Sequence, residues 1–203
     1  KQHQFGWALY LFLLIMKKPF VISIIGISSS GKTTLGRRLY QYLLDSGVTS
    51  LQLIDGDIVR EFLKGKIGYS ASDRDLSASI QTQLAFFLHN HGISSIVCNI
   101  SPFEKSRAFA RKMIPGIIEI HLACPLSVCM NRDKNLGKKV YDPVSKGITK
   151  NVNIVGIDIE FEKPQKTDLV LNTDLENPND SFKRILEFLA NRWNYKKLLL
   201  TDF

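Results

Sequence analysis

The chain has 203 residues, of which 44% are hydrophobic and 23% charged, and its formal net charge at pH 7 is +8. This balance is typical of a folded globular protein and excludes an intrinsically disordered one. The positive charge favours an anionic partner. Because the lysines are dispersed along the chain, we expect a small anionic ligand and a solvated surface rather than a nucleic-acid interface.

We expect one domain, since the sequence contains no internal repeat, low-complexity tract or Gly/Ser-rich linker. Residues 1–15 contain an apolar run that is too short to span a bilayer, and no small-residue cleavage site follows it. A methionine stands at position 16, directly before the first predicted strand. We therefore interpret residues 1–15 as an extension and residues 16–203 as the domain, with a peripheral apolar anchor as the alternative for the extension.

The three cysteines, Cys98, Cys124 and Cys129, lack the spacing of a metal site. Two of them stand in apolar runs that are typical of strands. This pattern predicts reduced thiols and a cytoplasmic location.

Predicted strands and helices alternate from residue 19 onward. The strands are short apolar runs rich in β-branched residues, which are typical of a parallel sheet buried on both faces: residues 19–26, 50–55, 94–100, 116–124 and 168–173. The helices show apolar residues at helical spacing: residues 33–47, 78–90, 103–114 and 181–193. This order predicts an α/β fold with a parallel five-stranded sheet and helices on both faces.

Residues 26–33, GISSSGKT, match the phosphate-loop pattern G-x-x-x-x-G-K-[ST] in full and lie between a predicted strand and a predicted helix. Backbone N–H groups at such a turn can surround phosphate oxygens. Lys32 can reach the β- and γ-phosphates, and the Thr33 hydroxyl can ligate Mg²⁺. The motif predicts a P-loop NTPase fold that binds a nucleoside triphosphate, and a chance Ser/Gly turn is the alternative. The predicted nucleotide-binding residues here are Gly26, Ser28, Ser29, Ser30, Gly31, Lys32, Thr33 and Thr34.

Residues 55–60, DGDIVR, follow the second predicted strand. Ligands bind at the carboxyl edge of such sheets, so a carboxylate there can orient Mg²⁺ or take a proton from an attacking hydroxyl. Arg60 can hold an anionic substrate, although an ordinary turn is the alternative interpretation of DGD. After the third strand, Ser101-Pro102 predicts a rigid turn over the site. For Arg107 and Arg111 we expect a solvated helix face.

From the phosphate loop to about residue 172 the sequence resembles the adenylylsulfate (APS) kinase family. The resemblance rests on the order and spacing of GISSSGKTT, DGDIVR, GYSASDR, ISPFEKSRAFAR, an RD pair at residues 132–133 and GIDIEFEKP at residues 156–164. It implies Mg²⁺- and ATP-dependent phosphorylation of the 3′-hydroxyl of adenylyl sulfate in sulfate activation. The implied partners are ATP and an anionic nucleotide acceptor, with a homodimer as an option and without nucleic acid or a membrane.

The resemblance also implies roles for individual residues. Asp57 would be the base, and residues 132–139 would form a mobile lid that excludes water during transfer. The implied catalytic residues are Lys32, Asp57 and Ser101. The implied metal ligands are Thr33 and Asp55, and Arg132 joins the ATP site. The implied acceptor-binding residues are Asp57, Arg60, Tyr69, Arg74, Ser77, Ile100, Ser101, Lys139 and Ile154, with Lys139 preferred to Lys138.

The acceptor segment, residues 68–80, departs from the family pattern. Where the family has an asparagine and two arginines that help to seat the acceptor, this chain has Ser77, Ser79 and Ile80. Two aromatic residues enclose adenine in the family. Tyr69 occupies one of these positions, but Ile154 occupies the other and cannot stack as a ring does.

Each lost charge-assisted hydrogen bond costs roughly 1.5–3 kcal/mol. The alternative function is therefore a kinase of the same fold that acts on another nucleotide, such as cytidine diphosphoramidate, in surface-polysaccharide modification. A nucleotide-binding protein without catalysis is the third, less favoured hypothesis. We expect residues 68–80 to form an acceptor-binding loop.

Overall fold

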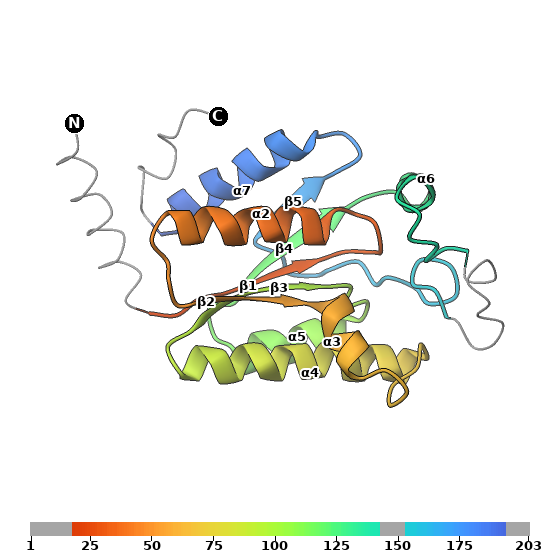
Figure 1. Cartoon of the computed structure of the whole chain (residues 1–203), viewed down its shortest axis with the longest axis horizontal. Coiled ribbons are helices and arrows are strands. Elements are labelled where there is room, and N and C mark those ends of the chain that lie inside the picture. Colours follow the sequence, from red (N-terminus) through yellow and green to blue (C-terminus); the bar gives the residue numbers. More distant parts are fainter. Residues whose placement is uncertain (1–17, 143–152, 194–203) are drawn as a thin grey trace.

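The computed structural model describes residues 18–142 and 153–193. The predicted extension, residues 1–15, lies outside these ranges. Figure 1 shows one sheet between two layers of helices. In the described part of the chain, no helix is both long enough and apolar enough to cross a membrane.

The sheet contains five parallel strands in the order β2-β3-β1-β4-β5. Their bounds are Val21–Ile25 (β1), Leu51–Asp55 (β2), Ser94–Asn99 (β3), Ile118–Ala123 (β4) and Leu169–Asn172 (β5). The predicted parallel five-stranded sheet is thus confirmed. The central strand, β1, pairs with β3 on one side and β4 on the other, so its carboxyl end lies at the switch point where ligands bind in such sheets.

Helices cover both faces of the sheet, as predicted (Figure 1). One face is covered by α2 (Lys32–Asp45) and α7 (Pro178–Arg192), and the other by α3 (Gly56–Phe62), α4 (Ala71–Asn90) and α5 (Glu104–Met113). The remaining helix, α6 (Leu126–Asn135), lies beyond the carboxyl ends of the strands. The predicted lid, residues 132–139, therefore begins in the last turn of α6, and its mobility stays a prediction.

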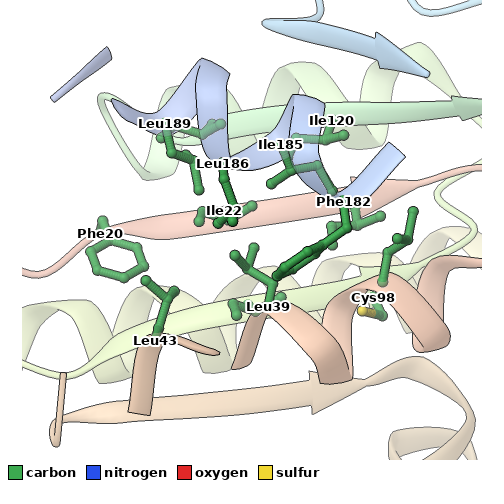
Figure 2. Packing of buried hydrophobic residues seen from close by; sticks show 14 of the residues in the cluster. Phe20, Ile22, Leu39, Leu43, Cys98, Ile120, Phe182, Ile185, Leu186 and Leu189 are labelled. Atoms are coloured by element: carbon green, nitrogen blue, oxygen red, sulfur yellow. The ribbon is translucent and has the colours of Figure 1, made fainter. Parts of the chain in front are cut away.

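Successive side chains of β1 enter two different cores because a strand alternates its faces. Ile22 packs with Leu39 of α2 and Phe182 of α7, as Figure 2 shows. Val21 packs on the opposite face with Val59 of α3 and other apolar residues. Burial on both faces explains why this strand is apolar at nearly every position.

Helix α4 begins at Ala71, seven residues before the predicted start at residue 78. Ser70 and Asp73 form a capping box: the Ser70 hydroxyl accepts the Asp73 N–H, and the Asp73 carboxylate accepts the Ser70 N–H, both at 3.1 Å. The prediction that residues 68–80 form a loop is therefore wrong, since only residues 68–70 precede the helix. The serines and aspartates that suggested a loop are instead the start signal of a helix.

The solvated helix face predicted for Arg107 and Arg111 is also wrong. Arg107 is 1% exposed, and Arg111 is partly buried between Glu104 and Glu119. Both arginines lie on the side of α5 that faces the sheet, and carboxylates and carbonyls there satisfy their charge and donors.

The contact between α2 and β3 provides a test of the packing. At Gly36 a Cβ atom would lie 2.2 Å from Cys98 Sγ. We expect Gly36→Ala to lower the free energy of unfolding by about 1–3 kcal/mol, because overpacking outweighs the gain of about 1 kcal/mol in helix propensity. Urea unfolding would measure the change.

Adding Cys98→Ala to Gly36→Ala should recover much of the loss, since it removes the sulfur that clashes. Equal stability of Gly36→Ala and the unmodified protein would contradict a tight contact at this position.

Candidate active site

The phosphate loop leads from β1 into α2. Ser29 and Gly31 have φ angles of 60° and 105°, a left-handed conformation that lets successive N–H groups turn toward one side. No described side chain caps α2, so the amides of its first turn remain available to phosphate oxygens. Glycine is required at position 26, where a Cβ atom would lie 2.7 Å from the Leu122 carbonyl oxygen.

Lys32 folds back across the loop, and its Nζ donates to the Ile27 carbonyl at 2.6 Å. Burial lowers the pKa of Lys32 to about 8, although the nearby Asp57 carboxylate opposes this shift. A bound phosphate would raise this pKa again. The charged form of Lys32 would therefore be stabilised by an anion bound at the loop.

Residues distant in sequence hold the loop from outside. Thr173, after β5, donates its hydroxyl to the Ser30 carbonyl at 3.0 Å, and the Arg132 guanidinium donates to Thr173 in turn. The Tyr141 hydroxyl donates to the Ser28 carbonyl at 2.9 Å. These bonds use carbonyls of the loop and none of its N–H groups, of which the Ser30 N–H donates within the loop to the Ile27 carbonyl at 3.3 Å.

A cavity of about 270 Å³ opens beside the phosphate loop. It brings together the loop, the start of α3, one side of α4, the end of β3 and the end of α6. The predicted site residues that line it are Ser28, Ser29, Ser30, Gly31, Lys32, Thr33, Thr34, Asp55, Asp57, Arg60, Arg74, Ser77, Ile100, Ser101 and Arg132.

The other predicted site residues lie outside this lining. Gly26 supports the loop from beneath, against β4. Tyr69 lies next to the cavity and is 40% exposed, whereas Ile154 is only 7% exposed. In the predicted lid, Lys138 lines the cavity and Lys139 does not.

Asp55 and Asp57 have different surroundings. Asp55 is 5% exposed, accepts the Asp57 N–H at 3.0 Å, and lies 3.7 Å from an Arg37 nitrogen. Asp57 is exposed toward the cavity. Among the described residues, no group of three or more His, Cys, Asp or Glu residues could hold a metal ion. The hydroxyl of Thr33 and these carboxylates could supply oxygen ligands to an Mg²⁺ ion whose remaining ligands are nucleotide phosphates and water.

Two arginines of the cavity lie against the ring of Tyr69. The guanidinium carbons of Arg60 and Arg74 are 4.4 Å and 5.3 Å from the ring centroid. Arg60 donates to the Gly68 carbonyl at 2.5 Å, and Arg74 donates to the Asn153 carbonyl at 2.6 Å. Burial and the charge of Arg60 lower the pKa of Arg74 to about 10.

Each of these arginines also has an unused donor. Arg60 Nη1 and Arg74 Nε are buried and have no hydrogen-bond partner among the described residues. Two neighbouring cations with unused donors form an arrangement that an anionic ligand would stabilise.

The motifs did not reveal Gln81 or Asn99, which also line the cavity. Gln81 donates to the Ser77 carbonyl at 3.1 Å, and its Oε1, like Asn99 Oδ1, has no described partner. Gln81 lies one helical turn after Ser77, so helical spacing would have indicated it if the start of α4 had been recognised. Asn99 is the last residue of β3, at the edge where ligands bind.

Known proteins share this sequence and fold. Residues 18–172 match the family model of adenylylsulphate kinase. An adenylyl-sulfate kinase from Halothermothrix orenii is 34% identical over 176 residues, which are 87% of this chain and 92% of that protein. A cytidine diphosphoramidate kinase from Campylobacter jejuni is 36% identical over 160 residues, 78% of this chain and 89% of that protein.

A solved structure agrees with these relatives. The APS kinase of Mycobacterium tuberculosis, in complex with AMPPNP and APS, has a TM-score of 0.74 and 27% identity, and the match covers 85% of this chain and 98% of that one. The family match includes the phosphate loop, DGDIVR and the Ser101 turn, so it covers most of the cavity lining as well as the sheet. This confirms the predicted P-loop kinase fold and a phosphotransferase activity with a hydroxyl acceptor. The chain is a nucleotide kinase and belongs to the adenylylsulfate kinase family.

Proposed function

We propose that the chain transfers the γ-phosphoryl group of ATP to the 3′-hydroxyl of adenylyl sulfate, which gives 3′-phosphoadenylyl sulfate and ADP. The observation that carries this proposal is the pair Arg60 and Arg74, which line the same cavity as the phosphate loop and each keep one buried donor without a described partner. The negatively charged phosphosulfate group of the acceptor would pair with these two guanidinium groups.

The loop amides and Lys32 would hold the phosphates of ATP, and Arg132 would border the same nucleotide. Thr33 and Asp55 would hold Mg²⁺, which neutralises charge on the phosphates when it is bound. The acceptor oxygen bonds to the γ-phosphorus while the bond to the β–γ bridging oxygen breaks. Asp57, exposed toward the cavity, takes the hydroxyl proton.

On the acceptor side, Ile100, Ser101 and Ser77 would border the ribose and its substituents. Within the predicted lid we now favour Lys138 for the acceptor, because Lys138 lines the cavity. We assign the activity to residues 16–203 and to the cytoplasm. The described cysteines are free thiols, which fits a reducing compartment.

Cytidine diphosphoramidate is the second candidate acceptor. The Campylobacter jejuni relative supports it, and so does the base side of the site. Ser77 is 5% exposed and hydrogen-bonded to Gln81, and the buried Ile154 offers no ring opposite Tyr69. A pyrimidine, which is smaller than adenine, could stack on Tyr69 alone.

An acceptor panel would test the proposal. ADP release with Mg·ATP should rise when adenylyl sulfate is added, and mass spectrometry should show one added phosphate on the ribose. If ADP release rises with cytidine diphosphoramidate and not with adenylyl sulfate, the second candidate acceptor replaces the first. ADP release that responds to neither acceptor would reject both.

Asp57→Asn should lower kcat by about 10²–10⁴-fold, because the amide cannot take the proton from the attacking hydroxyl. The KM for ATP should change little. Glu61→Gln is the matched control, since Glu61 lies on the same helix and is exposed beside Lys64. A kcat for Asp57→Asn close to that of the control would show that another group accepts the proton.

Arg74→Lys should raise the KM for the acceptor by about tenfold and leave the KM for ATP unchanged, because lysine lacks the second donor direction of a guanidinium. Steady-state kinetics with each substrate varied in turn would measure both constants. Arg192→Lys, a change of an exposed arginine in the last turn of α7, is the control. Equal effects of Arg74→Lys on both substrates would contradict an acceptor-side role.

A further inference from the structure

Arg107 is a buried arginine that the reaction scheme above does not use. It lies on α5 and is 1% exposed, yet all three of its guanidinium nitrogens donate hydrogen bonds. Nε donates to Glu104 at 3.0 Å, Nη1 to the Ser101 carbonyl at 2.7 Å, and Nη2 to the Glu162 carbonyl at 2.8 Å. One side chain thus joins α5 to two separate stretches of backbone.

The first of these stretches is the turn that ends β3 at the cavity. Ser101 has a φ of 43°, which is unfavourable for a residue with a Cβ atom, and Pro102 follows it directly. Such a conformation persists only where the surroundings hold it. The bond from Arg107 to the Ser101 carbonyl is a restraint of that kind.

The second stretch is the backbone at Glu162, which is closely tied to the same turn. The Glu162 N–H donates to the Pro102 carbonyl at 2.9 Å, and the Glu162 carboxylate accepts the Glu104 N–H at 2.5 Å. Arg107 completes this arrangement by binding the Glu162 carbonyl. Its guanidinium also lies 5.5 Å from the ring centroid of Phe161.

The far end of the same segment is held by the acceptor-side arginine. Arg74 donates to the Asn153 carbonyl, next to Ile154. Residues 153–162 are therefore held by Arg74 at one end and by Arg107 at the other. The position of this segment against the Ser101 turn depends on both guanidinium groups.

The neighbouring Arg111, on the same helix, forms ion pairs and provides a comparison with Arg107. It binds two carboxylates, Glu104 and Glu119, and among the described residues it makes no hydrogen bond to the Ser101 turn. A buried ion pair can often be replaced by apolar side chains of similar volume without loss of stability. The two bonds of Arg107 to main-chain carbonyls instead fix geometry, because the planar guanidinium sets their direction.

We propose that Arg107 is a positioning residue of the acceptor site: it holds Ser101 in its left-handed conformation and holds residues 161–162 against the Ser101 turn, without touching either substrate. This inference rests on the proposed function in that Ser101 borders the acceptor. The ATP side depends on the phosphate loop and does not depend on Arg107.

Arg107→Lys tests the proposal, with Arg111→Lys as the matched control on the same helix. Lysine keeps the charge but cannot reach two carbonyls and a carboxylate in fixed directions. We expect Arg107→Lys to lower kcat/KM for the acceptor by about 10- to 100-fold, while the KM for ATP stays within about twofold. Arg111→Lys should leave both constants within about twofold of those of the unmodified protein.

Amide hydrogen exchange supplies a readout that needs no acceptor. In Arg107→Lys, peptides that contain the amides of Glu104 and Glu162 should exchange at least about tenfold faster, while peptides of the phosphate loop keep their rates. If the unmodified protein phosphorylates no acceptor, the proposed function fails, and the exchange rates still decide the role of Arg107.

Unchanged exchange at Glu104 and Glu162 in Arg107→Lys would overturn the proposal. An equal loss of kcat/KM for ATP and for the acceptor would also overturn it, because such a loss indicates general damage to the fold. If Arg107→Lys does not fold, Arg107→Gln, which keeps one donor group, is measured in the same way. Failure of both to fold, with Arg111→Lys folded, would show that Arg107 is required by the whole domain and not specifically by the acceptor site.

Discussion

The close contact between α2 and the sheet determines the position of the phosphate loop at the carboxyl edge of the sheet. Leu39 and the neighbouring leucines of α2 fill the core between β1, β3 and α7 (Figure 2). The absence of a side chain at Gly36 lets the helix approach Cys98. The helix begins at the phosphate loop. Its distance from the sheet therefore sets where the first-turn amides and Lys32 lie, and any shift of the helix moves all phosphate contacts together.

In the protein without ligands, the cavity gathers positively charged side chains whose charge the described residues only partly neutralise. Burial lowers the pKa of Lys32, and burial together with the nearby charge of Arg60 lowers the pKa of Arg74. Unused donors remain on both arginines. Anionic ligands that enter the cavity would offset the cost of bringing these cations together, so the proposed binding of two nucleotides would gain from charge that destabilises the empty site.

Local sequence patterns predicted the sheet and the phosphate loop because both depend on neighbours in the chain: apolar runs for the strands, and eight consecutive residues for the loop. The patterns failed where the determining contacts are distant. Within residues 71–80, Arg74, Ser77 and Ala78 line the cavity while Ala71, Ser72 and Leu76 are exposed, so the segment lacks the apolar period of a helix and only the capping box marks the helix start. Arg107 seemed solvated because its partner at Glu162 is 55 residues away and is a main-chain carbonyl, which no side-chain pattern reveals.

The acceptor side shows how a kinase of this fold can change its acceptor through few substitutions. Arg74 lines the cavity, where it would bind the anion of the proposed acceptor, and it also holds the Asn153 carbonyl beside Ile154. Residues 153–162 include Ile154, which stands where the family has the second aromatic residue that stacks on adenine. Arg74 and Arg107 hold this segment through its backbone carbonyls. The side chain at position 154 can therefore vary without loss of the segment's position. In the proposed reaction, Arg74 would therefore support both the side that binds the anion and the side that binds the base. Because the side chain at position 154 could change without loss of that support, a related nucleotide could take the place of adenylyl sulfate.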